Sequence, residues 1–212
     1  LKKTGTKEGC SEGGCGACTI VLGELVDNKI EYKAINSCIS FVPSLNGKQL
    51  IIVEDLVSEN GKLHPVQDAM VKFHGSQCGF CTPGFVMSLF SMFKNNKSLN
   101  NELITDSISG NLCRCTGYRP IIDAAKSLNK INKNDQFSKN KNKVIQQLKK
   151  IKPKNVYIKK DDKIYFSPKN IKDLKGIIKK HTNFNFLAGG TDLSLKVTKA
   201  VSYTHLRAHE TE

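Results

Sequence analysis

Apolar residues recur at helical spacing in the middle of the chain, at 85–93 and again at 121–128. A proline stands before each run, which suits the first turn of a helix, and Thr82 is the predicted N-cap of the earlier helix. Two shorter helical patterns, each ended by a glycine, span 66–74 and 101–109. We therefore expect a domain of four helices at 63–131.

The residues before this domain follow the pattern of strands instead. Residues 19–23 are apolar, 29–34 alternate between apolar and polar, and 49–53 form a further apolar run. The first two runs lie only a few residues apart, so we expect them to pair as a hairpin. The pattern thus predicts a small sheet at 1–62 that precedes the helices.

The pattern changes again after the helical domain. Lysine, asparagine and glutamine dominate 132–155, which predicts a solvated basic linker with a weak helix near 144–148. Short strands are then predicted at 156–158 and 163–166, a helix at 171–180 and a buried strand at 183–187. This last strand runs into Gly189-Gly190, and a glycine turn after a strand can cradle a phosphate with its backbone N–H groups. On its own that signal is weak, because the dinucleotide-binding glycine pattern is absent.

The chain has 212 residues and a net charge of +14, which raises the question of a nucleic-acid partner. Nearly all of the positive charge is lysine, since Arg114, Arg119 and Arg207 are the only arginines. Aromatic and basic residues do not alternate as they do in single-strand binding platforms. We therefore expect no nucleic-acid partner, and the positive field suits an acidic partner subunit instead.

The cysteines and the absence of long apolar runs indicate a compartment. No run approaches the roughly 20 residues of a membrane helix, and no leader pattern is present, so we expect no membrane contact. We expect a cytoplasmic protein whose 8 cysteines bind metal in a reducing compartment rather than form disulfides. The chain begins at Leu1 without a methionine, so we also expect the native amino terminus to be missing.

The first group of cysteines lies in the glycine-rich segment 9–18. Cys10, Cys15 and Cys18, followed at a distance by Cys38, have the spacing of plant-type [2Fe–2S] ferredoxins. Glycines let such a loop bring N–H groups close to sulfur, which tunes the reduction potential. A four-cysteine zinc site is the alternative, but zinc sites usually gather their ligands as two tight pairs. We predict an iron–sulfur cluster here.

The other four cysteines form two pairs, Cys78 with Cys81 and Cys113 with Cys115. Each pair stands before a predicted helix, and helix N-termini favour anionic groups such as a thiolate-bound cluster. By spacing alone, zinc and iron–sulfur are equally compatible with this quartet. The residues therefore predict a second metal centre, in the helical domain, without deciding the metal.

Together and in this order, the two cysteine motifs resemble the iron–sulfur part of the molybdenum hydroxylases, the family of xanthine dehydrogenase and aldehyde oxidase. The resemblance covers residues 1–129. It implies one [2Fe–2S] cluster on Cys10, Cys15, Cys18 and Cys38 and a second on Cys78, Cys81, Cys113 and Cys115. Gln77 and Cys115 match positions that approach the molybdopterin of a partner subunit.

A later segment resembles the first flavin-binding loop of the same family. The resemblance implies contacts to FAD from Phe186, Leu187, Ala188, Gly189, Gly190, Thr191, Asp192 and Leu193. Residues 189–199 are similar to the small subunit of the xanthine dehydrogenase subtype, in which electrons pass from a molybdopterin-binding large subunit through both clusters to FAD and NAD+. The alternatives are a hetero-oligomeric relative that oxidises aldehydes or N-heterocycles, and a stand-alone ferredoxin-like electron carrier.

The expected fold class is α+β, arranged in successive parts. These are a partial β-grasp, ferredoxin-like [2Fe–2S] domain at 1–62, a four-helix [2Fe–2S]-binding domain at 63–131, the basic linker at 132–155 and the start of an α+β FAD-binding domain at 156–199. Only the beginning of the flavin domain is present, so we do not expect this length of chain to hold FAD stably. Residues 200–212 differ in composition from the rest, and we expect a non-native tail there.

Overall fold

The computed structural model describes residues 2–151, 155–161 and 163–199. The tail expected at 200–212 lies outside the described residues. None of the helices formed by the described residues is long and apolar enough to cross a membrane.

A three-stranded antiparallel sheet forms the first part of the chain. Its strands are β1 (Thr19–Val26), β2 (Lys29–Asn36) and β3 (Gln49–Ile51), in the order β2-β1-β3. The predicted hairpin of β1 and β2 is confirmed, and it turns at Asp27-Asn28, where both residues have the positive φ that a tight hairpin turn requires. The third strand is shorter than expected because a 3-10 turn, η3 (Val53–Leu56), begins at Val53.

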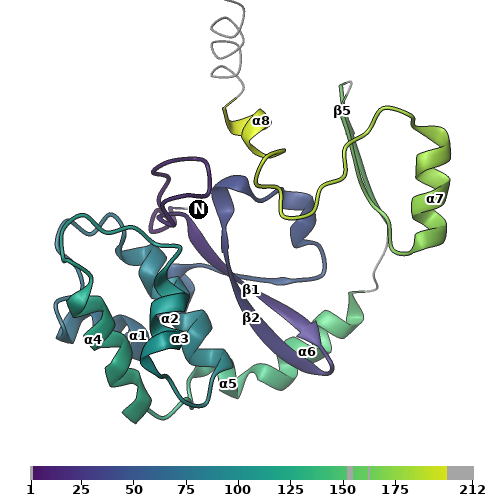
Figure 1. Cartoon of the computed structure of the whole chain (residues 1–212). Helices are drawn as coiled ribbons and strands as arrows, with labels where there is room; N and C mark the ends of the chain where they lie inside the picture. The colour runs from purple at the N-terminus through teal and green to yellow at the C-terminus, as the bar shows by residue number, and fades with distance from the viewer. Residues whose placement is uncertain (1, 152–154, 162, 200–212) are drawn as a thin grey trace, which may run out of the picture.

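Four helices follow the sheet, as predicted. They are α1 (Pro65–Lys72), α2 (Thr82–Asn95), α3 (Asn101–Ile108) and α4 (Arg119–Ser127), the teal group in Figure 1. Helix α2 is buried from Gly84 to Phe93 and packs against both β1 and β2. One continuous apolar core therefore joins sheet and helices, from Val21 on β1 to Phe90 on α2.

The predicted cap of α2 is wrong by one residue. Cys81 occupies the N-cap position and makes no side-chain capping bond. The Thr82 hydroxyl instead donates to the Ser76 hydroxyl at 2.7 Å, so it ties the preceding loop to the helix rather than capping it.

The weak helix expected near 144–148 is confirmed as part of a longer helix, whereas the solvated surroundings expected for this linker are wrong for its middle part. Residues there form α5 (Gln136–Lys139) and α6 (Lys141–Lys150), which follow the 3-10 turn η4 (Leu128–Lys130). Leu148 is buried, and Phe137 and Val144 pack against the core. These apolar residues recur at helical spacing, so α6 rests on β1 and β2 despite its many lysines.

A buried polar network fastens this segment to the helical domain. The Asp135 carboxylate, N-cap of α5, lies 2.7 Å from Lys94 Nζ and 2.9 Å from His64 Nε2. His64 Nδ1 accepts from Val66 N–H at the start of α1, so its Nε2–H donates to Asp135. Burial alone would raise the pKa of Asp135, but the hydrogen bonds from His64 and Lys94 hold it well below its usual value.

The last described part contains an antiparallel hairpin and two helices. Its elements are β4 (Val156–Lys160), β5 (Lys163–Ser167), α7 (Ile171–Lys180) and the short α8 (Leu195–Thr198). The predicted strands and the helix at 171–180 are confirmed. The buried strand predicted at 183–187 is wrong: the segment is irregular and Phe186 is 67% exposed. No described strand pairs with it, so its backbone lacks the partner that a strand requires.

Candidate metal centres

The first cysteine quartet forms around the loop that leads into β1. Cys10 Sγ accepts three backbone N–H groups of this loop, from Glu12 at 3.5 Å, Gly14 at 3.3 Å and Cys15 at 3.3 Å. Burial alone would raise the pKa of Cys10, but these hydrogen bonds, together with one from the Cys15 thiol, lower it to about 7. Gly13 has a positive φ of 78°, which lets the loop turn its N–H groups inward. The loop is therefore built to stabilise negative charge on sulfur.

The fourth member, Cys38, reaches the loop from the 3-10 turn η1 (Ser37–Ile39), which follows β2. Burial raises the pKa of Cys38 to about 12, and a hydrogen bond with the Cys18 thiol and the charges of Cys18 and Cys10 act in the same direction. Cys10 and Cys15 are likewise hydrogen bonded to each other. The structure thus brings together all four cysteines that the motif predicted, in two contacting pairs.

The second quartet lies between α2 and α4. Burial raises the pKa of Cys81 to about 12, and a hydrogen bond with the Cys113 thiol and the charges of Cys113 and Cys78 add to the shift. The Cys115 thiol is hydrogen bonded to Cys78, which raises the pKa of Cys115. Cys78 and Cys115 are exposed, whereas Cys113 is buried. The two predicted pairs are therefore brought together, and each contact joins one cysteine from before α2 to one from before α4.

Side chains from the start of α4 support the second quartet. The Thr116 hydroxyl lies 3.2 Å from Cys113 Sγ, and its backbone N–H donates to the same sulfur at 3.5 Å. Burial alone would raise the pKa of Cys113, but these contacts lower it. The Tyr118 hydroxyl accepts from Cys113 N–H at 3.0 Å, and Tyr118 takes the left-handed N-cap conformation of α4. Neither Thr116 nor Tyr118 was among the predicted site residues.

A buried seam joins the two quartets. Leu112 N–H donates to the carbonyl of Cys15 at 2.9 Å, so the residue before Cys113 is hydrogen bonded to a residue of the first quartet. Asn111, which is 3% exposed, donates to Gly16 O at 3.0 Å and to Thr19 Oγ1 at 3.2 Å. Its own carbonyl accepts from the Ser88 hydroxyl at 2.6 Å. The amide of Asn111 is therefore fully engaged between β1, α2 and the second cysteine loop.

Two glycines make the close approach at this seam. A Cβ on Gly84 would lie 2.1 Å from the carbonyl oxygen of Gly16, and a Cβ on Gly16 would lie 2.3 Å from the carbonyl oxygen of Gly110. Gly16 also has a positive φ of 69°. Only glycine fits at these two positions, so the spacing of the two quartets is set by backbone contact rather than by adjustable side chains.

The pairing of the thiols bears on the kind of metal centre. Among the described residues, no three side chains of His, Cys, Asp or Glu surround a single point closely enough to hold one ion. Each quartet instead consists of two thiol pairs in contact, with like charges that raise the pKa of Cys38, Cys81 and Cys115. A two-iron cluster takes two cysteines on each iron, and its positive irons offset that repulsion. The residues fit such a cluster.

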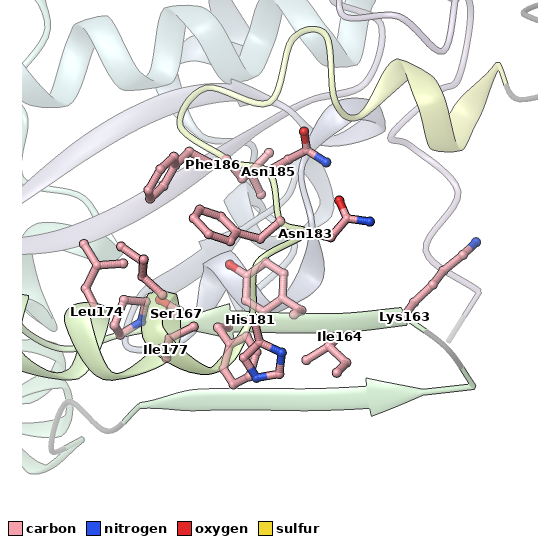
Figure 2. Close-up of a pocket in the computed structure, with 15 residues that line it drawn as sticks. Lys163, Ile164, Ser167, Leu174, Ile177, His181, Asn183, Asn185 and Phe186 are labelled. Carbon is pink, nitrogen blue, oxygen red and sulfur yellow. The ribbon is translucent and has the colours of Figure 1, made fainter.

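The predicted flavin segment lies beside Ile39, the residue after Cys38 of the first quartet. Gly190 has a positive φ of 78°, as a glycine turn requires, while Phe186 is 67% exposed. Phe186 and Leu187 line a groove together with β5, α7 and His181 (Figure 2). Most of the groove's lining is apolar, and the glycine turn at Gly189-Gly190 is not part of that lining. Gln77 is exposed immediately before Cys78.

A family model described as a [2Fe-2S] binding domain matches residues 52–126. The quinoline 2-oxidoreductase of Pseudomonas putida 86 superposes with a TM-score of 0.51 and 38% identity, over 58% of this chain and 70% of that one. This chain belongs to the molybdenum hydroxylase family. The aldehyde oxidoreductase of Desulfovibrio gigas also matches, with a TM-score of 0.52 and 32% identity over 68% of this chain and 15% of that one.

Curated members of the molybdenum hydroxylase family include both subtypes considered above. The xanthine dehydrogenase of Blastobotrys adeninivorans is 55% identical over 125 residues, which is 58% of this chain and 9% of that protein. Aldehyde oxidase 1 of Oryctolagus cuniculus is 48% identical over 129 residues, 60% of this chain and 10% of that protein. The chain thus spans about a tenth of these relatives, and it contains the iron–sulfur domain of an oxidoreductase family.

Proposed function

We propose that this chain carries electrons within a molybdenum hydroxylase of the xanthine dehydrogenase subtype. The observation that supports this most directly is the division of the eight cysteines into two groups of four, because every thiol contact lies within one group. When bound, two [2Fe–2S] clusters supply one-electron carriers between a molybdopterin on a partner subunit and FAD, with NAD+ as the final acceptor.

The cysteines of each quartet are the proposed ligands of one cluster. In the first, N–H groups of Glu12, Gly14 and Cys15 surround the Cys10 sulfur and stabilise its charge. In the second, Thr116 does the same for Cys113 with its hydroxyl and its backbone. Hydrogen bonds to cluster sulfurs favour the more negative, reduced state, so these groups raise the reduction potential of their cluster.

The face around the second quartet is the proposed contact with a molybdopterin-binding large subunit. Cys78 and Cys115 are exposed there, and the neighbouring apolar side chains Phe80 and Leu112 are 47% and 54% exposed. Apolar side chains grouped on a surface are typical of protein interfaces. In this arrangement Gln77 and Cys115 approach the molybdopterin, and the assembly is a hetero-oligomer without nucleic acid or membrane.

The segment 186–193 is the proposed beginning of the FAD site, in a cytoplasmic enzyme of purine oxidation. The support is its glycine turn at Gly190 and its position beside η1, which carries Cys38. The aldehyde oxidase relative is nearly as similar as the xanthine dehydrogenase, so oxidation of aldehydes is the second candidate. A substrate assay on the complete hetero-oligomer, with xanthine and with an aldehyde, separates the two.

The metal content of the full-length subunit tests the proposal. Purified without oxygen, it should contain about four iron and four sulfide per chain and give two separate electron paramagnetic resonance signals on reduction. Cys38→Ser should remove only one signal and Cys113→Ser only the other. A colourless preparation, or one with zinc and no sulfide, would overturn the proposal.

The proposed role of Gln77 has its own test. In the complete hetero-oligomer, Gln77→Ala should slow reduction of the clusters by substrate while both clusters remain assembled. Reduction by dithionite, which does not use the molybdopterin, serves as the control and should be unchanged. Equal substrate reduction rates in the variant and the wild type would reject the role.

A further inference from the structure

Ser194 is buried in a part of the chain that is otherwise open to solvent. It is 2% exposed, and no other described residue from 155 to 199 is buried. Its hydroxyl donates to the carbonyl of Ile39 at 2.6 Å, across 155 positions of sequence. Ile39 is the residue after Cys38, so this hydrogen bond ends one residue from a proposed ligand of the first cluster.

The surroundings of Ser194 form a closed turn. Its N–H donates to Gly190 O at 2.9 Å, and its carbonyl accepts from Thr198 N–H at 3.0 Å in α8. A Cβ on Gly190 would lie 2.9 Å from Ser194 Oγ and 3.4 Å from Ile39 O. The glycine turn and the serine therefore fit against the Ile39 carbonyl as one unit, and Figure 1 shows α8 (yellow) next to the loops of the first domain.

Ile39 links this unit to the cysteine loop on its other side. A Cβ on Gly13 would lie 2.7 Å from Ile39 Cδ1, so the Ile39 side chain packs directly on the loop that surrounds Cys10. Its carbonyl faces Ser194. A second contact joins the same regions, since the rings of Phe41 and Tyr165 have centroids 6.4 Å apart. One residue thus touches both the first cysteine loop and the glycine turn of the proposed flavin segment.

We propose that Ser194 is a positioning residue that holds the glycine turn on the Cys38–Ile39 side of the first cluster, and that this side is where electrons leave for the flavin. The inference rests on the proposed function. Each transfer oxidises the first cluster by one electron and reduces the flavin by one, and no bond is made or broken. The Ser194 hydroxyl acts by fixing the distance between the two groups.

Two variants of the full-length subunit test this role. Ser194→Ala removes the hydroxyl, and Ser194→Thr keeps it. Ser127→Ala is the matched control, because the Ser127 hydroxyl also donates to a carbonyl at 2.6 Å, that of Ala124, at the end of α4. Loss of one such hydrogen bond should speed amide exchange about fivefold in the segments 38–42 and 190–199 in Ser194→Ala only.

Electron transfer gives the second readout. After dithionite reduces the clusters, the flavin of Ser194→Ala should be reduced several times more slowly than that of the wild type. The signals of both clusters and the amount of bound FAD should remain unchanged, and Ser194→Thr should restore the rate. Unchanged amide exchange in both segments, or an unchanged flavin reduction rate, would overturn the inference. A wild-type subunit without flavin would reject the proposed function instead, while amide exchange still tests the contact.

Discussion

The two cysteine quartets are supported by different parts of the protein. The first lies in a glycine loop, and three backbone N–H groups reach the sulfur of Cys10. The second lies between two helices, where the Thr116 side chain reaches Cys113 and where Cys78 and Cys115 are exposed. The contacts to Cys10 are therefore set mainly by backbone conformation, whereas Cys113 depends also on the Thr116 hydroxyl, which a single substitution can remove.

The stability of the helical domain around the second quartet should be more sensitive to the loss of a buried charge than that of the sheet around the first. Asp135→Asn leaves Lys94 without its carboxylate partner in a site where both side chains are nearly inaccessible, at 5% and 6% exposure. We expect the free energy of unfolding to fall by about 3 to 5 kcal/mol, because an unpaired buried charge destabilises the folded state. Urea unfolding followed by circular dichroism measures this, and a loss below about 1 kcal/mol would show that the network is not a stabilising centre.

The Asp135 carboxylate should also set how the stability of the helical domain depends on pH under acidic conditions. Because its folded pKa lies below the usual 3.8, its contribution is complete above that value and is lost as pH falls further. Wild-type stability should thus drop steeply below about pH 4, and that of Asp135→Asn much less. Glu24→Gln, in the sheet, is the matched control. Burial alone would raise the pKa of Glu24, but lysines 33 and 48 lower it, and these ion pairs lie at the surface. Equal pH dependence of Asp135→Asn and the wild type would contradict the assignment.

Substitutions in the buried seam between the quartets should have the next largest effect on stability. Gly84→Ala places a Cβ 2.1 Å from a backbone oxygen of the first cysteine loop, so the two quartets are forced apart. We expect the free energy of unfolding to fall by about 2 to 3 kcal/mol and the magnetic coupling between the proposed clusters to change. Gly110→Ala is the control, because nothing lies within 4 Å of its added Cβ. Equal unfolding curves for the two variants would show that the backbone at the seam can shift to accept the Cβ without loss of stability.

Asn111→Ala tests the polar part of the seam. It leaves the Ser88 hydroxyl without its buried acceptor, whereas the Gly16 carbonyl and the Thr19 hydroxyl lose the amide but keep the hydrogen bond between them. The free energy of unfolding should fall by about 2 kcal/mol. A double-mutant cycle with Ser88→Ala should show coupling between the two residues, because one buried hydrogen bond joins them. Additive effects would mean that Ser88 finds another partner.

The smallest effect should be electronic and confined to the second quartet. Thr116→Val removes the hydroxyl next to Cys113 and nearly keeps the volume, whereas Thr116→Ser keeps the hydroxyl. We expect the potential of one cluster to fall by about 40 mV in the valine variant only, the equivalent of roughly 1 kcal/mol for one electron. Redox titration by electron paramagnetic resonance measures both clusters, and a shift in both would remove the distinction between the quartets.

Local patterns predicted most elements and both quartets, because spacing along the chain determines them. The apolar face of α2 and the β1–β2 hairpin follow from periods of helix and strand, and the cysteines follow from motifs. The strand predicted at 183–187 failed because a strand needs a partner that sequence periodicity does not supply. The solvated surroundings expected for the linker were wrong because Phe137 in α5 and Val144, Ile145 and Leu148 in α6 are buried or pack against the core.

The seam could not be predicted for a related reason. Asn111 meets Gly16, which lies 95 residues earlier, and an asparagine next to a cysteine motif gives no sign of such a partner. Thr116 and Tyr118 follow closely after Cys115 in the sequence, but their roles depend on the left-handed turn before α4. The motif therefore identifies the cysteines of each quartet, and the fold identifies the side chains that contact them and the seam that sets their spacing.

The contact between Asn111 and Gly16 also sets an order of events during synthesis. A ribosome adds about 5 to 20 residues each second, so the first cysteine loop emerges roughly 5 to 20 s before the asparagine that seals it, given the 95 residues between them. During that interval the loop is open on one side. Iron delivered to the nascent chain would meet an unfinished first site, and the seam closes only once the second cysteine motif has been translated.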